Sequence, residues 1–348
     1  MTARIVSIGS DDLDCKEIYD AAEIIKRGGL VVFPTETVYG LGADATSPDA
    51  AKKIYEAKGR PKDNPLIIHI ADPVDAEKYT YTSELYYKIA EAFMPGPITV
   101  IMRSRDTVPL TTRGGLDTVA VRCPENPIAR RLIALSGTPI AAPSANLSGS
   151  PSPTSAKHAI DDMHDRCDMI IDGGECEFGL ESTIVKIDDD GSLVLLRPGK
   201  ITVTDLVMLG VDVRIADAVT DKLGEGEVAL SPGMKYRHYA PKARVVLLDG
   251  SAEAFAAYIK ANLSERTAVI SYTEDQELIK QEIPSADFYD FGSRSDLAEQ
   301  AHRLFGILRD ADKCDYDVIY APLPDKDGIG LALYNRMIRA AAHDIIRL

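Results

Sequence analysis

The sequence contains no tryptophan, and aromatic residues make up only 6% of its 348 positions. Proteins that bind extended single-stranded nucleic acid stack successive bases on aromatic side chains, so this scarcity argues against such a surface. Positive charge is also scarce, because 39 Lys and Arg stand against 54 Asp and Glu and give a formal net charge of −15. We therefore expect no stable nucleic-acid binding, although a small basic pocket for one nucleotide is compatible with this charge.

The five cysteines are scattered and contain no Cys-x-x-Cys pair. That pattern favours neither a zinc site nor a disulfide framework and indicates reduced thiols. No apolar run approaches the roughly 18 residues that a membrane-spanning helix needs. The N-terminal sequence MTARIVSI has no long apolar segment after a basic start, so no signal peptide is visible. These absences predict a cytoplasmic protein without a membrane partner.

The length of the chain is sufficient for two domains. Over residues 1–210, short apolar runs alternate with stretches of helical spacing, and the runs are too many for a simple alternating parallel sheet. We therefore predict an α/β domain with a mixed twisted sheet. Over residues 243–348, strand and helix patterns alternate regularly, which predicts a small parallel α/β domain of the Rossmann-like, doubly wound type.

Residues 211–242 are predicted to form a linker, because the periodic pattern fades there and Gly224–Glu227 is typical of a loop. A helix over Ile201–Leu209 is expected to end the first domain, and one over Leu331–Ile346 to end the second. Residues 231–241 read SPGMKYRHYAP, which is basic and aromatic in an otherwise acidic chain. A linker without a function is not expected to be rich in basic and aromatic residues. A functional segment and a rigid packed spacer are equally compatible with this composition.

Three cations lie within five residues at the start of the segment Lys58–Pro65 (KGRPKDNP). Each proline pushes the residue before it out of the helical region, so the segment is predicted to be a rigid loop. The apolar run Leu66–Ile70 that follows is typical of a buried strand. Such a loop in an acidic chain indicates a site for a polyanion, and the alternative is a solvated charged turn.

Polar side chains follow the apolar run Leu30–Phe33, in the segment Pro34–Gly42 (PTETVYGLG). Two hydroxyls, a carboxylate and a phenol at the end of a strand are typical of α/β sites. The glycine spacing matches neither a dinucleotide-binding fingerprint nor a Walker loop. The alternative is a polar turn whose glycines serve the backbone shape.

A strand is predicted over Thr118–Arg122, and its alternation places Thr118, Ala120 and Arg122 on one face. An arginine on such a face is costly to bury without a partner. A carboxylate held by two parallel N–H bonds would be such a partner. The alternative is an edge-strand arginine that points to water.

Three further stretches place small or polar residues beside predicted strands. Residues 141–149 (AAPSANLSG) carry small side chains that would let a ligand approach the backbone amides. Residues 181–184 (ESTI) begin one strand, and residues 195–199 (LLRPG) end another. Each stretch alone is also compatible with an ordinary loop.

Together these stretches resemble the threonylcarbamoyl-AMP synthase family in its two-domain form, with PTETVYGLG, AKGRPKDNPL, LDTVAVR, APSANLSG, ESTI and LLRPG in the family's order. Residues 1–210 resemble the YrdC-like catalytic domain, and SPGMKYRHYAP with the small C-terminal domain is typical of the long form. The resemblance implies synthesis of L-threonylcarbamoyladenylate and pyrophosphate from L-threonine, bicarbonate (or CO2) and ATP. The product would feed a transferase complex that modifies the adenosine next to the anticodon of certain tRNAs.

The resemblance also implies which residues contact each substrate. Those around the threonine would be Thr35, His69, Arg122, Ala142 and Ser182. Those around the ATP would be Lys58, Arg60, Asn64, Thr118, Ser144, Ser152, Arg197 and Tyr236. Lys58 and Arg60 are expected to act in catalysis, since cations near the phosphates offset the repulsion between two anionic reactants. Mg²⁺ is expected to arrive with ATP, with no metal site built from the protein alone.

Three alternatives stay open on the sequence. The first is an RNA-binding, translation-linked protein, against which the acidic charge and missing aromatics count. The second is the carbamoyl transfer of hydrogenase maturation, in which a YrdC-like domain is joined to zinc-finger domains that this chain lacks. The third is a relative that uses another amino acid, because one methyl group distinguishes threonine from serine by only about 1–3 kcal/mol.

Overall fold

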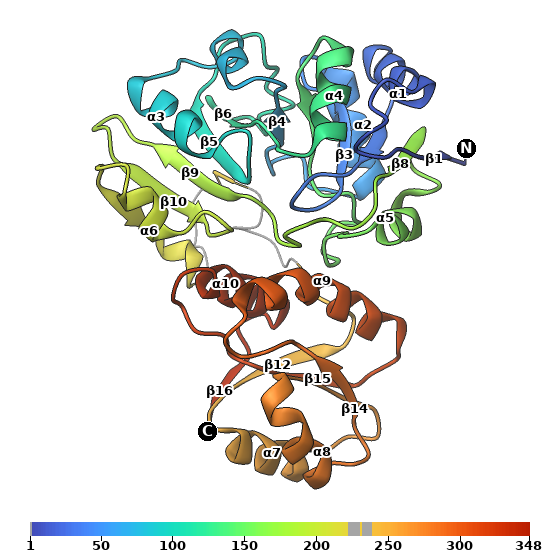
Figure 1. Ribbon diagram of the computed structural model, residues 1–348, viewed down its shortest axis with the longest axis vertical. Helices are drawn as coiled ribbons and strands as arrows, with labels where there is room; N and C mark the ends of the chain where they lie inside the picture. Colours follow the sequence, from blue (N-terminus) through green and yellow to red (C-terminus); the bar gives the residue numbers. More distant parts are fainter. Residues whose placement is uncertain (1, 222–229, 232–238) are drawn as a thin grey trace. The chain divides into compact units, whose positions relative to one another are not determined.

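A computed structural model of the chain describes residues 2–221, 230–231 and 239–348. The chain forms two compact units (Figure 1). The first unit comprises Met1–Ser148 and Ser152–Lys235, and the second joins the short segment Gly149–Pro151 to Tyr236–Leu348. Residue Tyr236, expected at the nucleotide, lies outside the described residues.

Within the described residues, eleven strands of the first unit form one sheet. In spatial order the strands are β1 Arg4–Ser7, β8 Met169–Asp172, β2 Val31–Phe33, β3 Gly40–Asp44, β7 Ile140–Ala141, β4 Ile67–His69, β6 Thr118–Arg122, β5 Ile98–Arg103, β9 Thr183–Ile187, β10 Leu193–Arg197 and β11 Val213–Ile215. Strand β6 runs parallel to β4 and antiparallel to β5. The predicted mixed sheet is therefore confirmed.

Six α-helices belong to the described residues of the first unit. They are α1 Lys16–Lys26, α2 Pro48–Lys58, α3 Glu84–Phe93, α4 Pro127–Ser136, α5 Ala156–Met163 and α6 Val203–Val207. For α2, the Ser47 side chain accepts a hydrogen bond from the Ala50 N–H, and Gly59 ends the helix with a left-handed φ of 62°. Because α2 stops there, Lys58 occupies the last helical position and the basic loop starts at a fixed point.

One face of this sheet is covered by α1 and α4 (Figure 1). Val31 and Phe33 of β2 pack with the apolar sides of both helices in one buried cluster. Burial of such side chains is the main favourable contribution to folding, at about 25 cal/mol per Å² of apolar surface. The polar segment that follows Phe33 therefore starts from a rigid point.

The end of the first unit differs from the predicted pattern. The helix expected over Ile201–Leu209 is shorter, since α6 covers only Val203–Val207 between a Thr202 capping box and Gly210, whose φ is 72°. Strand β11 then lies inside the predicted linker and pairs in parallel with β10. A three-residue strand has too little periodicity to be visible in the sequence, and its pairing partner defines it.

The second unit contains five strands among its described residues, and every pair is parallel. In spatial order they are β14 Asp287–Asp290, β13 Thr267–Ser271, β15 Val318–Pro322, β12 Arg244–Asp249 and β16 Ile345–Arg347. Its helices are α7 Ala252–Ala261, α8 Gln276–Glu282, α9 Leu297–Lys313 and α10 Gly330–Ala340. Figure 1 shows α7 and α8 on one face of this sheet and α9 and α10 on the other. The predicted small parallel α/β domain is confirmed.

The prediction of one helix over Leu331–Ile346 is wrong at its end. Helix α10 stops at Ala340, because Ala342 and His343 adopt left-handed φ values of 50° and 65°. Residues Ile345–Arg347 then form β16, which adds to the sheet beside β12. Alanine and histidine rarely adopt this conformation, so the sequence carried no visible stop signal.

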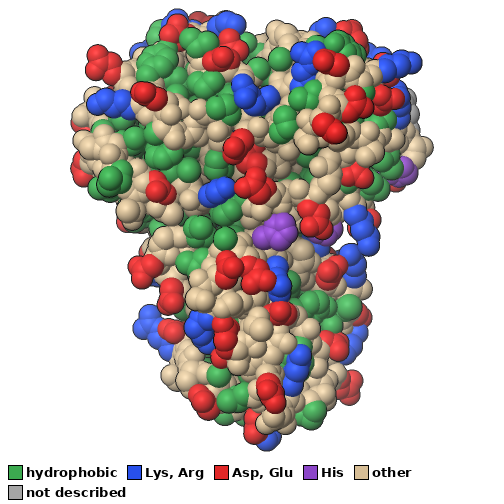
Figure 2. Space-filling view, in the orientation of Figure 1, with side chains coloured by type: hydrophobic (Ala, Val, Ile, Leu, Met, Phe, Trp, Pro, Cys, Tyr) green, Lys and Arg blue, Asp and Glu red, His purple; other side chains and the backbone are tan. Residues whose placement is uncertain are grey.

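Lys and Arg side chains are interspersed with Asp and Glu over the face drawn in Figure 2. Such mixing agrees with the acidic composition of the chain. In the part of the chain that the structure describes, no helix is both long enough and apolar enough to cross a membrane.

Candidate active site

The segment after β2 is a tight polar turn built around Thr35. The Thr35 hydroxyl donates to the Val38 carbonyl at 2.6 Å and accepts from the backbone N–H groups of Thr37 and Val38 at 3.2 Å each. β3 then returns antiparallel to β2, with Phe33 opposite Gly40. The hydroxyl of Thr35 thus shapes the turn that presents the next residue, Glu36.

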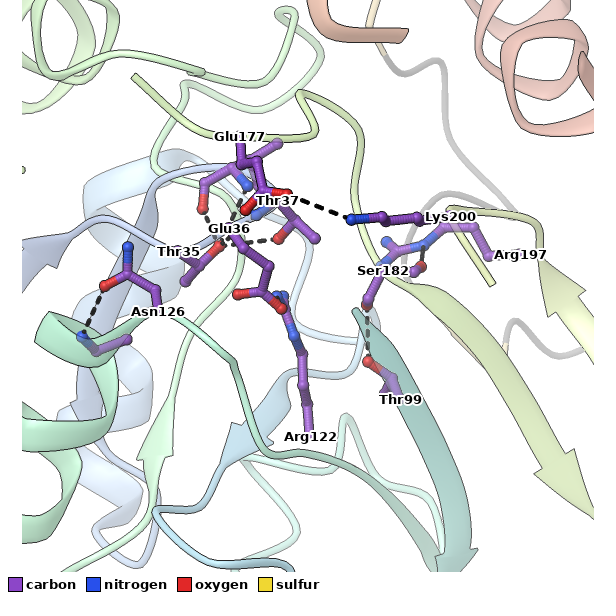
Figure 3. A network of polar contacts seen from close by, with 12 residues as sticks. Thr35, Glu36, Thr37, Thr99, Arg122, Asn126, Glu177, Ser182, Arg197 and Lys200 are labelled. Carbon is purple, nitrogen blue, oxygen red and sulfur yellow. Dashed lines mark hydrogen bonds and ion pairs between the residues drawn. The ribbon is translucent and has the colours of Figure 1, made fainter. Parts of the chain in front are cut away.

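Glu36 and Arg122 form a buried ion pair at the centre of this region (Figure 3). The Arg122 Nη2 lies 2.7 Å from the Glu36 Oε1, and the two side chains are only 5% and 6% exposed. The sequence predicted that Arg122 needs a carboxylate partner if it is buried, and the protein itself supplies one. The alternative of an edge-strand arginine facing water is wrong.

His69 and Ala142 lie beside this pair. His69 of β4 stands opposite Arg122 of β6 in the parallel register, and its Nδ1 lies 3.3 Å from the Ile140 carbonyl oxygen. Burial and the nearby Arg122 charge lower the pKa of His69 to about 3. His69 is therefore neutral at physiological pH. The Ala142 N–H donates to the Ile67 carbonyl at 2.9 Å, which holds the small-residue loop against β4.

Lys58 is buried, with only 2% of its surface exposed. Its ammonium donates to the Ser144 carbonyl at 2.5 Å and to the Asn146 carbonyl. The Ser144 hydroxyl in turn donates to the Asn146 side-chain oxygen at 2.5 Å, and the Ser148 N–H donates to the Lys58 carbonyl. The basic loop and the small-residue loop, which lie far apart in sequence, are thus joined at Lys58.

Arg60 and Asn64 fix the shape of the basic loop. The Arg60 Nη2 donates to the Asn64 side-chain oxygen at 2.7 Å and to the Pro65 carbonyl at 3.0 Å. Both residues are buried, as is Lys58, which contradicts a solvated turn for Lys58 and Arg60, whereas Lys62 of the same segment is exposed. Thr118 opens β6, about 13 Å along the strand from Arg122 at its other end.

A second polar network joins Ser182 and Arg197 (Figure 3). The Arg197 guanidinium donates to the Ser182 carbonyl and to its hydroxyl, and the hydroxyl also lies 2.7 Å from the Thr99 hydroxyl. Next to Ser182, the Glu181 carboxylate accepts a 2.5 Å hydrogen bond from the Ser152 hydroxyl. All five side chains are buried.

The structure thus brings most of the sequence-predicted residues together in four groups. Lys58 contacts Ser144, Arg60 contacts Asn64, and Ser182 contacts Arg197. His69 and Arg122 are register neighbours, close to Thr35 through Glu36. Thr118 lies on the same strand as Arg122, and Ala142 is tied to β4 through its hydrogen bond to the Ile67 carbonyl. Tyr236 lies outside the described residues.

Four polar residues of these networks were missed as site residues by the sequence analysis, namely Glu36, Thr99, Asn146 and Glu181. The sequence did contain a signal for Glu36, because this residue lies in the predicted polar turn and a buried Arg122 needs a carboxylate partner. Thr99 gave none, since it lies inside an apolar strand. Within the described ranges, no group of three or more His, Cys, Asp or Glu side chains could hold a metal ion.

Comparison with known proteins connects both units to one family. A family model described as "Telomere recombination" matches residues 23–199. A second model, described as the C-terminal domain of threonylcarbamoyl-AMP synthase, matches residues 201–342. Each compact unit of the fold therefore contains most of one matched region.

Relatives align with this chain over nearly its whole length. The chain is 43% identical to the threonylcarbamoyl-AMP synthase of Pyrococcus abyssi, covering 94% of this chain and 95% of the relative. It is 42% identical to the enzyme of Bacillus subtilis, covering 95% and 94%. The crystal structure of P. abyssi Sua5 complexed with L-threonine superposes with a TM-score of 0.86 at 40% identity and covers 99% of both chains. The chain therefore belongs to the threonylcarbamoyl-AMP synthase family, in its two-domain form.

Proposed function

We propose that this protein is an L-threonylcarbamoyladenylate synthase, which converts L-threonine, bicarbonate (or CO2) and ATP into threonylcarbamoyl-AMP and pyrophosphate. The observation that carries this proposal is the similarity over nearly the full length to relatives of that name, one of which is described as complexed with L-threonine. The buried polar groups around Arg122, Lys58 and Arg197 are the features that such a reaction needs.

The threonine would bind where β2, β4, β6 and β9 bring polar groups together. Arg122 carries the positive charge that an α-carboxylate requires, and charge-assisted hydrogen bonds of this kind are about twice as strong as neutral ones. Ser182 presents a buried hydroxyl, and Ala142 leaves room for the substrate. Thr35 and His69 would complete the walls, the latter as a neutral ring.

The nucleotide would bind beside the loops that Lys58 joins. Carbamate formed at the threonine nitrogen must attack the α-phosphorus of ATP, and both reactants are anions. Lys58 and Arg60 place positive charge in a buried region, where its effect on phosphate oxygens is much stronger than in water. Asn64, Thr118, Ser144, Ser152, Arg197 and Tyr236 would supply the remaining contacts.

Mg²⁺ would enter as part of the substrate MgATP. The donor set of the described residues fits this role, because it offers no cluster of three acidic or imidazole ligands for a resident ion. Mg²⁺ is commonly held by phosphate oxygens and water with few protein ligands. Its charge would add to that of Lys58 and Arg60 in neutralising the phosphates.

The product would pass to a transferase complex that modifies tRNA, because threonylcarbamoyl-AMP is an activated intermediate with no use of its own. The reaction would take place in the cytoplasm, where ATP, threonine and tRNA occur together. The acidic charge of the chain fits a protein that hands over a small molecule and does not itself hold tRNA.

Mass spectrometry of the product formed from threonine, bicarbonate and MgATP tests the proposal. We expect threonylcarbamoyl-AMP, with pyrophosphate release that requires both threonine and bicarbonate. Omission of each substrate in turn is the control. Pyrophosphate release that ignores threonine, or the absence of the carbamoyl adenylate, would contradict the proposed function.

A further inference from the structure

The buried ion pair between Glu36 and Arg122 is made at a single point. A carboxylate and a guanidinium can form two parallel hydrogen bonds, yet only the Nη2–Oε1 contact of 2.7 Å is present. The second carboxylate oxygen, Oε2, and the Arg122 Nε are both buried and have no hydrogen-bond partner among the described residues. The pair thus leaves one acceptor and one donor unused.

This unused pair is the complement of an amino-acid zwitterion. The Arg122 Nε can donate to an α-carboxylate, and the Glu36 Oε2 can accept from an α-ammonium. A buried polar group without a partner is rare in native proteins and calls for an explanation such as a missing ligand. A bound α-amino acid would satisfy both atoms at once.

Carbamate formation needs the threonine nitrogen as a neutral amine, although the free amino acid carries an ammonium at neutral pH. We propose that Glu36 is the catalytic base that removes this proton, an inference that rests on the proposed function above. The Glu36 Oε2 would accept one proton from the ammonium. The nitrogen lone pair then attacks the bicarbonate carbon, and the C–O bond to the hydroxyl breaks. The departing hydroxide takes the second N–H proton and leaves as water.

The charges balance in this sequence. Ammonium and carboxylate give amine and carboxylic acid, and amine with bicarbonate gives the carbamate anion and water. The carbamate oxygen is then the nucleophile at the α-phosphorus, and pyrophosphate leaves. Protonated Glu36 returns its proton to solvent as the products depart.

The other titratable groups near Glu36 are unsuited to this role. Among the described residues they are Arg122 of β6, His69 of β4, Cys123 directly after β6 and Cys176 in the loop between β8 and β9. Burial raises the pKa of the Cys123 thiol to about 12 and raises that of Cys176 as well, so both stay protonated. His69, whose pKa is lowered by burial, is too weak a base and lies against the Ile140 carbonyl.

The substitution Glu36→Gln tests the proposal, because glutamine keeps the oxygen that Arg122 contacts and loses the basicity. Pyrophosphate release would be measured at saturating threonine, bicarbonate and MgATP from pH 6.5 to 9.5. We expect kcat to fall about 100-fold at pH 7, the lower range of a general base. We also expect the remaining kcat to rise about tenfold per pH unit, because the threonine ammonium would then lose its proton to the solvent and not to Glu36.

A second measurement separates proton removal from adenylate chemistry. Pyrophosphorolysis of threonylcarbamoyl-AMP to ATP needs only transfer of the adenylyl group, so Glu36→Gln should retain it within about threefold. A merely structural role of Glu36 would slow both directions alike. The surface substitution Glu177→Gln is the matched control, since the Glu177 side chain is 72% exposed and pairs with Lys200, and it should change neither rate.

Several results would overturn the inference. One is a Glu36→Gln enzyme with kcat within threefold of the wild type. Another is a Glu36→Gln enzyme whose kcat is reduced by the same factor at every pH. If Glu36→Gln does not fold, Glu36→Asp tests the role of Glu36 in its place. Aspartate keeps the carboxylate but sets it back by one methylene. We expect that variant to be slower with the wild-type pH profile, and unchanged activity would refute the role. An inactive wild-type protein would instead refute the proposed function itself.

Discussion

Arg197 holds Ser182 at two points, donating from Nε to the Ser182 carbonyl and from Nη2 to its hydroxyl, each at 3.0 Å. Ser182 is expected at the threonine and Arg197 at the ATP. The position of one substrate contact therefore depends on the other. Linked residues of this kind respond to mutation as a unit.

Substitution of Arg197 by lysine should therefore disturb both substrates. Lysine cannot reproduce the two-point contact, and each lost hydrogen bond of a charged donor is worth about 1.5–3 kcal/mol. We expect the KM values for threonine and for ATP both to rise, by about tenfold or more, in steady-state kinetics. Arg214→Lys in β11 is the control, because that side chain is 53% exposed and its surface ion pairs contribute little. A rise of the KM for ATP alone would show that the substitution of Arg197 does not reach the threonine site through Ser182.

Arg122→Ala should raise the KM for threonine more than that for ATP. The loss of a charge-assisted contact to the carboxylate should cost about 1.5–3 kcal/mol of binding. The variant also leaves the buried Glu36 without its partner, which should lower the free energy of unfolding by about 3–5 kcal/mol in urea denaturation. Adding Glu36→Gln should restore part of that stability. Equal effects on the two KM values would contradict the assignment.

Lys58→Ala should mainly reduce kcat. Loss of the buried cation removes charge stabilisation near the phosphates, an effect of about 10²–10³-fold for comparable groups. The substitution also removes the donor that joins Ser144 and Asn146 to the basic loop, so thermal unfolding should be recorded beside the kinetics. Lys52→Ala on the same helix, where the side chain is 52% exposed, should leave kcat unchanged. An unchanged kcat in Lys58→Ala at saturating ATP would remove Lys58 from the chemistry.

Stability should fall in acid partly because of His69. Burial lowers its pKa from 6.5 to about 3, so the unfolded chain binds a proton below pH 6.5 that the folded protein rejects. This destabilising contribution is absent above pH 6.5. It lowers the free energy of unfolding by about 1.4 kcal/mol per pH unit on acidification towards pH 3. His69→Phe should therefore flatten the pH dependence of urea unfolding between pH 4 and 6. A wild-type slope in the variant would contradict the burial of a neutral ring.

Two glycine-to-alanine substitutions should have opposite effects. A Cβ at Gly199 would lie 2.5 Å from the Thr183 nitrogen and 2.9 Å from the Glu181 carbonyl, so Gly199→Ala must displace the backbone on both sides of Ser182. We expect a loss of stability of about 1–3 kcal/mol. A Cβ at Gly306, inside α9, meets nothing within 4 Å, and Gly306→Ala should stabilise the helix by about 0.5–1 kcal/mol. Thermal unfolding of both variants checks the signs.

The sequence predicted the elements whose signals are local. Thr118–Arg122 was placed at its correct bounds because alternation and flanking polar residues mark it. The signals of helix α2 are equally local, since a serine cap, a proline in the first turn and a C-terminal glycine all lie at its own ends. The family's motifs also indicated both domains, because their order is specific even where each motif alone is weak.

Elements defined by distant partners escaped prediction. β11 and β16 have three residues each, and they exist because β10 and β12 offer free edges. The partner of Arg122 escaped for the same reason. The sequence indicated that a carboxylate was needed, but only folding shows that Glu36, 86 positions away, supplies one oxygen and leaves the other unused.

The three residues Gly149–Pro151 belong to the second unit although the chain on both sides of them belongs to the first. Within that second unit, Arg309 of α9 donates to the Pro151 carbonyl at 3.1 and 2.7 Å, and the Ala240 N–H donates to the Gly149 carbonyl at 3.0 Å. A single cut in the gene after residue 210 would therefore not separate two self-contained modules. It would deprive the peptide that leads directly into Ser152 of its anchors, so loss of activity in such a fragment would report on this peptide as well as on the deleted domain.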